Sequence, residues 1–357
     1  MDNLKPAGYK PEQFFYSLTP DKILTAVEAT GVRCSGRLLQ LGSFENRVYE
    51  VEVEAQPGHT PKTKAELFRV VKFYRPGRWS LAQIAEEHAF LQALANEDIP
   101  VASPLPLLTA NAAQEQTLGL VKQDDGHEGE NDSSIFFAVF PKVQGRRPEE
   151  LSDQELAMLG RLLARMHLVG KRSPAQHRLR LSTQSFGHAS LAELQRSHFI
   201  SPILFDRYSA LVLAICQRTD ALLAATEQQR IHGDCHLGNI LNGAQGFCFL
   251  DFDDMLTGPV IQDLWLLCGG RDAESQRQRD VFLRGYEEFA DFPHDSLRLI
   301  EPLRALRYVH YSAWIAKRWQ DPIFPRTFAH CQSQDYWIQQ LQDLEEVRDI
   351  MDSLGIF

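Results

Sequence analysis

Two aspartates and an asparagine lie close together in residues 232–254. Asp234 is followed five positions later by Asn239, and Asp251 comes after two short apolar runs. Asn242-Gly243 begins the loop between these runs and is typical of a hairpin, although the loop is longer than a two-residue turn. A hairpin would place Asp251 beside Asn239, with Asp234 one loop away. Three oxygen-bearing side chains that converge in this way suit a magnesium nucleotide and a hydroxyl that receives phosphate.

The spacing of these residues matches a known catalytic loop. Asp234 and Asn239 are separated as in the protein-kinase pattern H-R-D-x-x-x-x-N, where the aspartate accepts the hydroxyl proton and the asparagine holds a magnesium ion. Asp251, after a buried strand, would take the metal-binding part of the aspartate in D-F-G. Aspartate and asparagine are also common turn formers, which is the structural alternative. The order of all three groups around a hairpin favours the chemical interpretation.

A lysine and a glutamate upstream could form a buried ion pair. Lys72 shares one face of a predicted strand, residues 68–74, with apolar side chains, so it is either at an edge or held by a counter-charge. Glu87 falls on the apolar stripe of a predicted helix, residues 80–95, whereas Glu86 points away. A core-facing carboxylate needs a partner. We therefore expect Lys72 and Glu87 to pair and to orient a nucleotide, against the alternative of two unrelated surface charges.

Two further residues are weaker candidates for nucleotide binding. Ser43 lies in the loop 41–46, before an alternating strand at 47–53, and its hydroxyl and the nearby N–H groups could face phosphate. The kinase glycine-rich loop is absent there, so an ordinary turn is the alternative. His236, two residues after Asp234, could reach the transferring phosphate or could serve only in packing.

The alternation of His232, Asp234 and His236 also permits a metal-hydrolase site. Such a site needs more ligands, and the remaining histidines form no second cluster. We therefore interpret His232 as a packed residue that braces the loop. Asp263 lies near the start of a predicted helix, where a capping or loop-bracing role is expected.

The elements that must position these residues fall into two lobes. Residues 1–140 predict a small β-rich lobe that binds the nucleotide and includes one pairing helix. Its helices are predicted at 19–31 and 80–95, and its strands at 47–53, 68–74, 104–108, 118–122 and 135–140. Residues 55–64 predict a polar hairpin loop, and we expect the acidic loop 123–134 to be mobile.

Residues 141–357 predict a larger helical lobe that carries the catalytic loop and the metal site. The expected helices span 152–170, 203–225, 260–269, 276–290, 296–319 and 334–353, interrupted only by the hairpin at 240–250. The aromatic residues Tyr308, Tyr311 and Trp314 are interpreted as core. The predicted fold class is α+β, with a bilobal, protein-kinase-like arrangement.

Composition excludes several other classes of protein. A chain of 357 residues exceeds what one core usually serves, which agrees with two lobes. The net charge of −10 and the absence of a Lys/Arg-rich block argue against nucleic-acid and anionic-membrane partners. No run is long and apolar enough for a membrane span, and the N-terminus has no signal-peptide pattern. Six scattered cysteines indicate a reduced compartment, so we expect a cytoplasmic protein.

The motif His-Gly-Asp-x-His-x-x-Asn at 232–239, followed by a strand that ends in Asp251, resembles the aminoglycoside/choline kinase-like superfamily. Segments 43–49, 71–76, 232–236, 258–265 and 301–307 are similar to the stress response kinase A family of gamma-proteobacteria. The resemblance implies a bilobal kinase fold that uses ATP with Mg²⁺ to phosphorylate Ser/Thr hydroxyls of proteins in a stress response. We separately expect a monomer. The loops 55–64 and 123–134 depart from the family pattern and do not touch the matched positions.

The resemblance also implies roles for individual residues. Asp234 would accept the proton, and Asn239 and Asp251 would bind Mg²⁺. Ser43 would contact ATP, and Lys72 would orient its phosphates.

Two other functions stay open. Between Asp251 and Asp263 there is no room for the long activation segment of eukaryotic-type protein kinases, so the acceptor could be a small alcohol or amino alcohol. A non-catalytic ATP-binding regulator is the other alternative. The presence of Lys72, Asp234, Asn239 and Asp251 together argues against it.

Overall fold

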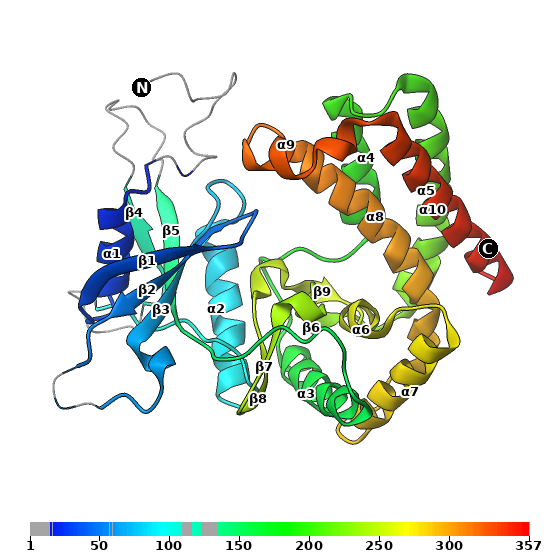
Figure 1. Ribbon diagram of the computed structural model, residues 1–357. Helices are drawn as coiled ribbons and strands as arrows, with labels where there is room; N and C mark the ends of the chain where they lie inside the picture. The colour runs from blue at the N-terminus through cyan, green and yellow to red at the C-terminus, as the bar shows by residue number, and fades with distance from the viewer. Residues whose placement is uncertain are drawn as a thin grey trace. The chain divides into compact units, whose positions relative to one another are not determined.

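The computed structural model describes residues 15, 17–56, 58, 60–108, 116–122 and 134–356 (Figure 1). The loop expected to be mobile, 123–134, lies outside these residues except for Ser134. The described chain forms two compact units. The N-terminal unit contains residues up to Pro148 together with Gly238–Asp253, and the C-terminal unit contains Glu149–Leu237 and the residues from Asp254 onward.

The N-terminal unit is built on an antiparallel five-stranded sheet with the order β1-β2-β3-β5-β4. The strands are β1 (Cys34–Leu41), β2 (Arg47–Val53), β3 (Phe68–Phe73), β4 (Gly119–Val121) and β5 (Ile135–Pro141). Strand β1 was not expected, because Ser35, Gly36, Arg37 and Gln40 break the apolar pattern of residues 34–41, and none of the eight residues is buried. The strand expected at 104–108 is wrong: the segment makes only an isolated bridge between Leu107 and Gln116.

Helices cover both faces of this sheet (Figure 1). Helix α1 (Pro20–Glu28) packs its Ile23 and Val27 against one face, where Val71 and Phe73 lie in the same apolar cluster. Helix α2 (Leu81–Ala95) covers the opposite face, on which Ile84 packs with Tyr74 and Ala138. Because successive strand residues point to opposite faces, Lys72 must face α2.

A β-hairpin formed by β7 (Ile240–Gly243) and β8 (Gly246–Phe249) completes the N-terminal unit. The expectation of a longer loop is wrong, because pairing continues to Gly243 and Gly246 and leaves a two-residue turn, 244–245. The hairpin was assigned from sequence to the C-terminal lobe, with the boundary at 140/141. It instead groups with the N-terminal unit, since Phe249 donates its N–H to the Pro100 carbonyl at 2.9 Å.

The C-terminal unit is mostly helical. Its helices are α3 (Asp153–Arg172), α4 (Ala189–Ser197), α5 (Pro202–Ala225), α6 (Ile261–Cys268), α7 (Ala273–Glu287), α8 (Ile300–Lys317), α9 (Ile323–Thr327) and α10 (Gln334–Ser353). The helix expected at 296–319 divides into a short 3-10 helix, His294–Leu299, and α8. Two short strands, β6 (Gln229–Ile231) and β9 (Leu256–Gly258), pair with each other and were not expected.

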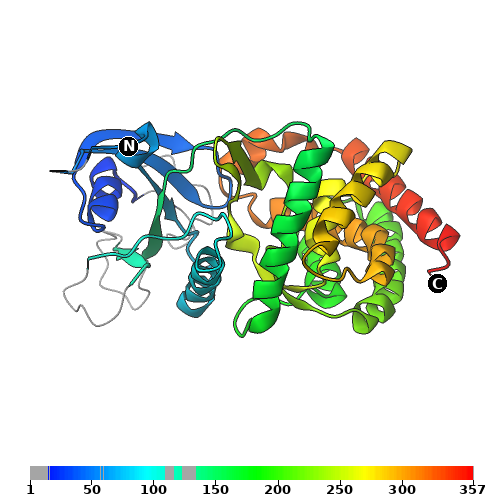
Figure 2. The same ribbon diagram turned by 90° about the horizontal axis from the view of Figure 1, so that it is seen from below.

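Two glycines let α3 and α7 lie side by side (Figures 1 and 2). A Cβ at Gly160 would meet the Phe282 carbonyl oxygen at 2.2 Å, and one at Gly285 would meet the Ala157 carbonyl oxygen at 2.2 Å. The two backbones therefore approach more closely than any other residue would permit at these positions.

A second packing layer joins α4, α5, α8 and α10. Its cluster includes Tyr208, Leu306, Val309 and Trp337, each at most 2% exposed. The assignment of Tyr311 to the core is wrong. It lies on the solvent side of α8 and is 46% exposed, although it stacks on Trp314.

Candidate active site

The first part of the site is the Lys72–Glu87 ion pair of the N-terminal unit. Lys72 on β3 is 7% exposed and Glu87 on α2 is 1% exposed, and Lys72 Nζ lies 3.4 Å from Glu87 Oε1. Two charges this deeply buried require one another. The pair expected from the strand face and the helix stripe is therefore present in the structure.

A second acidic residue, Asp253, joins this pair and was missed in the sequence. Its carboxylate is 3% exposed, and Oδ1 lies 3.0 Å from Lys72 Nζ. Burial by itself lowers the pKa of Lys72, but the carboxylates of Asp253 and Glu87 outweigh it and raise that pKa well above its ordinary value. The available signal was the run of acidic residues after Asp251, at positions 253 and 254.

Asp253 also ties the hairpin to the loop before β2. The Asn46 side-chain amide donates to Asp253 Oδ2 at 3.2 Å, and Arg78 donates to the same oxygen. Both arginines that follow β3 are held by buried carboxylates, Arg75 by Glu45 at 3.2 Å and Arg78 by Asp253. The cluster thus connects the sheet, the loop and the hairpin through charged groups.

The loop that contains Ser43 is held by Arg75. The Arg75 side chain donates to the carbonyl oxygens of Glu45 at 2.9 Å and Phe44 at 3.1 Å, and its backbone N–H donates to Asn46 Oδ1 at 3.0 Å. Ser43 itself is half-buried near the tip of the loop. Within the described part of the chain its hydroxyl has no hydrogen bond, so it is not part of the charged cluster.

Asn239 and Asp251 stand at neighbouring ends of the hairpin. The residue before Asp251, Leu250, donates its N–H to the Asn239 carbonyl at 2.8 Å. Asp251 has a φ of +58°, a left-handed conformation that is uncommon outside glycine, and its side chain is 55% exposed. Its Oδ1 lies 3.4 Å from Lys72 Nζ. The turn therefore presents an accessible carboxylate near the buried lysine.

The oxygen donors at this hairpin fit a divalent ion that is shared with a nucleotide. Among the described residues, no group of three or more His, Cys, Asp or Glu side chains could hold a metal alone. Mg²⁺ bound to a nucleotide needs only one or two protein carboxylates, because phosphate oxygens and water complete its shell. Asn239 and Asp251 supply one amide oxygen and one exposed carboxylate, which is a donor set of this kind.

The second part of the site is the loop His232–Asp234 of the C-terminal unit. It follows β6, and its backbone is fixed by Asp263 at the start of α6. Asp263 is fully buried and accepts the N–H groups of His232 at 2.9 Å and Gly233 at 2.8 Å. The loop-bracing role considered for Asp263 thus agrees with its contacts.

The shape of this loop depends on Gly233. Its φ is +86°, and a Cβ there would meet the Asp254 carbonyl oxygen at 2.2 Å. His232, which is fully buried, receives the Asp234 N–H on Nδ1 at 3.3 Å. Glycine is therefore required at position 233. Among the described residues, His232 and His236 do not belong to any group of side chains that could hold a metal.

Asp263 is held in turn by a buried histidine and a tyrosine. His167 on α3 places Nε2 3.2 Å from Asp263 Oδ2 and Nδ1 2.9 Å from the Tyr286 hydroxyl on α7. The chain Tyr286–His167–Asp263 lies in the core beneath the loop. It fixes the carboxyl that in turn fixes the backbone before Asp234.

The side chain of Asp234 lies between two nitrogen-bearing groups. Arg307 on α8 donates to Oδ1 at 2.8 Å, and His236 Nε2 lies 3.4 Å from Oδ2. Burial raises the pKa of Asp234, but the hydrogen bond from His236 and the charge of Arg307 outweigh it and hold that pKa below its ordinary value. Asp234 is therefore ionised at neutral pH.

Arg307 was missed as a site residue. It lies in the segment 301–307, which was recognised only as part of a family resemblance. An arginine on a helix 73 residues after its aspartate leaves no local signal of the contact. His236 lies against Asp234, and its expected role toward phosphate stays a prediction.

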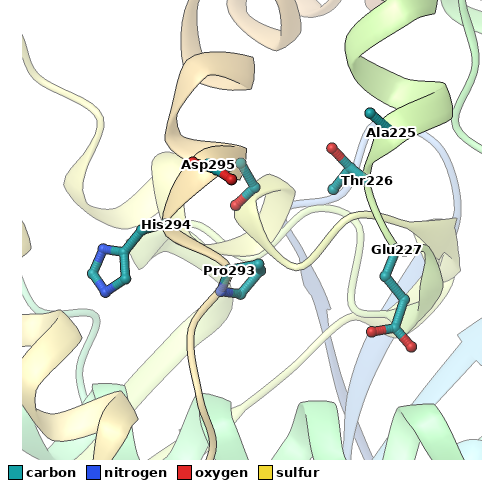
Figure 3. Close-up of a pocket in the computed structure, with 7 residues that line it drawn as sticks. Ala225, Thr226, Glu227, Pro293, His294 and Asp295 are labelled. Carbon is teal, nitrogen blue, oxygen red and sulfur yellow. The ribbon is translucent and has the colours of Figure 1, made fainter.

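A separate hollow of about 270 Å³ lies in the C-terminal unit between the end of α5 and the short 3-10 helix (Figure 3). Its lining includes Glu227, which pairs with Lys171 at 2.9 Å, and His294, which pairs with Glu287 at 2.6 Å. None of the predicted site residues lines it. We therefore place no chemistry in this hollow.

These features together define a kinase-like phosphotransferase. The strand lysine pairs with a helix glutamate, the hairpin carries Asn and Asp at its ends, and a third polar residue, an aspartate, lies on a braced loop. The chain belongs to the phosphotransferase enzyme family APH, which matches residues 37–300. It is 39% identical over 334 residues to "Stress response kinase A" of Escherichia coli (strain K12), covering 91% of each chain. It is 36% identical to "Serine/threonine protein kinase RdoA" of Salmonella typhimurium, covering 94% of each chain.

Solved structures confirm the predicted α+β, bilobal kinase-like fold. An amicoumacin kinase in complex with AMP-PNP and Ca²⁺ matches with a TM-score of 0.67 at 18% identity, over 93% of this chain and 94% of that chain. A microcompartment-associated aminopropanol kinase matches with a TM-score of 0.61 at 18% identity, over 94% and 99%. Within the described residues, no helix is both long and apolar enough to cross a membrane.

Proposed function

We propose that this protein is an ATP- and Mg²⁺-dependent kinase that phosphorylates Ser/Thr hydroxyls of proteins in a bacterial stress response. The observation that carries the proposal is the position of Asp234, bonded to Arg307 on its braced loop and five residues before Asn239. Five residues span at most about 17 Å, so the chain itself keeps the aspartate within reach of the hairpin that would hold the metal. The names of the curated relatives support the protein acceptor and the stress response.

The residues of the N-terminal unit would bind and orient the nucleotide. Lys72, fixed by Glu87 and Asp253, would contact the phosphates of ATP, and the Ser43 loop would cover them. Asn239 and Asp251 would hold Mg²⁺, which neutralises charge on the phosphates when it is bound. Because Lys72 is held from two sides, its ammonium is positioned before the nucleotide arrives, and positioning supplies most of the rate in this class of reaction.

Asp234 would orient the acceptor hydroxyl and take its proton. The hydroxyl oxygen forms a bond to the γ-phosphorus as the bond to the β,γ-bridging oxygen breaks, which yields ADP and a phosphate ester. The proton passes to Asp234 and then to solvent. A carboxylate with a lowered pKa is a weak base, which suits a loose transition state in which the proton leaves late.

A small-molecule acceptor is the second candidate. It is favoured by the solved structures that share the fold, which act on amicoumacin and aminopropanol as their names state. One experiment distinguishes a protein acceptor from a small-molecule acceptor. ATP with a radiolabelled γ-phosphate is incubated with a generic protein substrate, or with a panel of alcohols and amino alcohols.

The first candidate predicts label on serine and threonine of the protein. Label that appears only on a metabolite would contradict it. The Asp234→Ala variant is the control for contaminating kinases, because it should lose transfer to every acceptor. A phosphoproteomic comparison of cells that carry the wild-type chain or the Asp234 variant would then identify natural acceptors.

A further inference from the structure

Arg307 stands directly beside the carboxylate to which the acceptor hydroxyl would bind. Its NH1 group donates to Asp234 Oδ1 at 2.8 Å. The Arg307 side chain is 37% exposed and that of Asp234 is 23% exposed, so solvent and an acceptor can reach the pair. The hydrogen bond to Asp234 uses one of the five N–H donors of the guanidinium group.

Helix α8 is basic although the chain as a whole carries a net charge of −10. The one acidic residue of α8, Glu301, is held by Arg271 at 2.7 Å and by Arg304 at 3.2 Å. Arg304 also donates to the Gly269 carbonyl and lies over the Trp265 ring. Arg307 is thus the basic residue that α8 directs at Asp234, and Glu301 does not neutralise it.

The pair has a consequence for the charge of the acceptor. A carboxylate alone attracts an ammonium group, as in an amino alcohol. When Arg307 is bound to it, Asp234 no longer offers an uncompensated negative charge, and an ammonium close to the hydroxyl would meet the guanidinium. An acceptor carboxylate would instead find N–H donors with the fork geometry that arginine offers to carboxylates.

We propose that Arg307 selects the charge class of the acceptor, favouring a hydroxyl that is flanked by a carboxylate and excluding one that is flanked by an ammonium group. This inference rests on the proposed function, since it assigns the acceptor to the Asp234 side of the reaction. The acceptor that this selection favours presents a hydroxyl close to an anion. It is supplied either by a serine or threonine in an acidic peptide or by a free hydroxy acid.

A purely bracing role for Arg307 makes a different prediction. If the guanidinium only held Asp234 in place, its removal would lower transfer to all acceptors by the same factor. A selector changes the ratio between acceptors of opposite charge. That ratio is therefore the quantity to measure, and a lysine at position 307 should preserve it in part because the positive charge stays.

The experiment uses the full-length protein with ATP and Mg²⁺ and three serine peptides that differ only in the flanking residues, which are Asp, Ala or Lys. A free hydroxy acid and an amino alcohol of equal length form the second set of acceptors. The variants are Arg307→Met, Arg307→Lys and Lys317→Met. The last removes an equal charge from the same helix, about 15 Å further along its axis, without contact to Asp234.

We expect the wild-type kcat/KM for the Asp-flanked peptide to exceed that for the Lys-flanked peptide by about tenfold or more. Arg307→Met should reduce this ratio to one or below, because Asp234 then offers an uncompensated negative charge. Arg307→Lys should retain part of it, and Lys317→Met should leave it unchanged. A preference for the Asp-flanked peptide over the hydroxy acid identifies the peptide as the source of the anion, and the reverse order identifies the free acid.

Binding is measured in parallel with dye-labelled peptides in which alanine replaces the serine, in the presence of AMP-PNP. If the wild type prefers to bind the acidic peptide and Arg307→Met loses that preference, the selector is supported. If, in addition, no phosphate is transferred to serine peptides or small acceptors, the proposed kinase function is overturned. Transfer with the same charge ratio in the wild type and in Arg307→Met would overturn the selector and leave the kinase function intact. A wild-type preference for Lys-flanked peptides would also overturn the selector.

Discussion

His167 Nε2 lies 3.2 Å from Asp263 Oδ2 in the core of the C-terminal unit, and both side chains are at most 3% exposed. The contact fixes the carboxyl that accepts the backbone N–H groups of His232 and Gly233. The backbone before the proposed catalytic aspartate is thus determined by a residue 29 positions later in the chain, not by the loop itself.

Asp263→Asn should therefore destabilise the protein and impair the loop. The asparagine amide keeps one acceptor oxygen, but its NH₂ group then faces a backbone N–H of His232 or Gly233, and two donors cannot bond. This should cost about 2–4 kcal/mol in the free energy of unfolding. Urea denaturation measures the loss. The matched control is Asp206→Asn at an exposed position on α5, which should change stability by less than about 0.5 kcal/mol. Equal stability of the two variants would contradict the bracing role.

The loop should also be intolerant of a side chain at position 233. Gly233→Ala combines a φ of +86° with a Cβ that would meet the Asp254 carbonyl oxygen. Gly36 has a φ of +91° with no atom within 4 Å of its Cβ position, so Gly36→Ala measures the backbone strain alone. We expect Gly233→Ala to lose about 1–3 kcal/mol more than Gly36→Ala in thermal or urea unfolding. A similar loss for both would show that the loop can shift away from residue 254.

The buried cluster around Lys72 should be strongly coupled. Lys72→Met leaves the carboxylates of Glu87 and Asp253 in the core without their common cation, and should cost about 3–5 kcal/mol. Glu87→Gln in the same chain should recover part of that loss in a double-mutant cycle. The control is Lys142→Met, which breaks the more exposed pair with Glu50 and should cost at most about 1 kcal/mol. Strict additivity of the two changes at 72 and 87 would contradict the coupling.

Asp234 should make stability depend on pH in the acid range. Its pKa in the folded protein lies below the ordinary value of 3.8, so its contribution is complete above that value and disappears as pH falls through the folded pKa. The stability difference between wild type and Asp234→Asn should therefore shrink as pH falls from about 7 to about 2. In an Arg307→Met background the loss should be smaller and should end at a higher pH, because the guanidinium no longer lowers the pKa of Asp234 in the folded protein. A difference that is independent of pH would contradict the ion pair.

Parts of this site follow from sequence because they are local. The capping box at Ser80, the face of β3 that carries Lys72 and the stripe of α2 that carries Glu87 are periodic patterns, and they suffice to predict a pair. The hairpin at 240–249 was recognised from Asn-Gly, although its turn proved shorter than expected.

The missed residues depend on contacts between distant segments. Asp253 bonds with Asn46, 207 positions earlier, and Arg307 bonds with Asp234, 73 positions earlier. No spacing rule reaches across such distances. The grouping of the hairpin with the N-terminal unit was not foreseen for a similar reason, because its packing partner Pro100 lies 149 residues upstream of Phe249. Tyr311 was taken for core since helical periodicity cannot tell which side of an aromatic stripe is covered.

The most direct test of the proposed mechanism is phosphate transfer by Asp234→Asn, with ATP affinity measured on the same preparation. The proposed mechanism predicts that ATP and Mg²⁺ bind with nearly wild-type affinity, because Lys72, Asn239 and Asp251 are unchanged. Transfer to the acceptor should fall by about 10²–10⁴-fold. Near-normal turnover in this variant would contradict the role of Asp234, and with it the proposed mechanism.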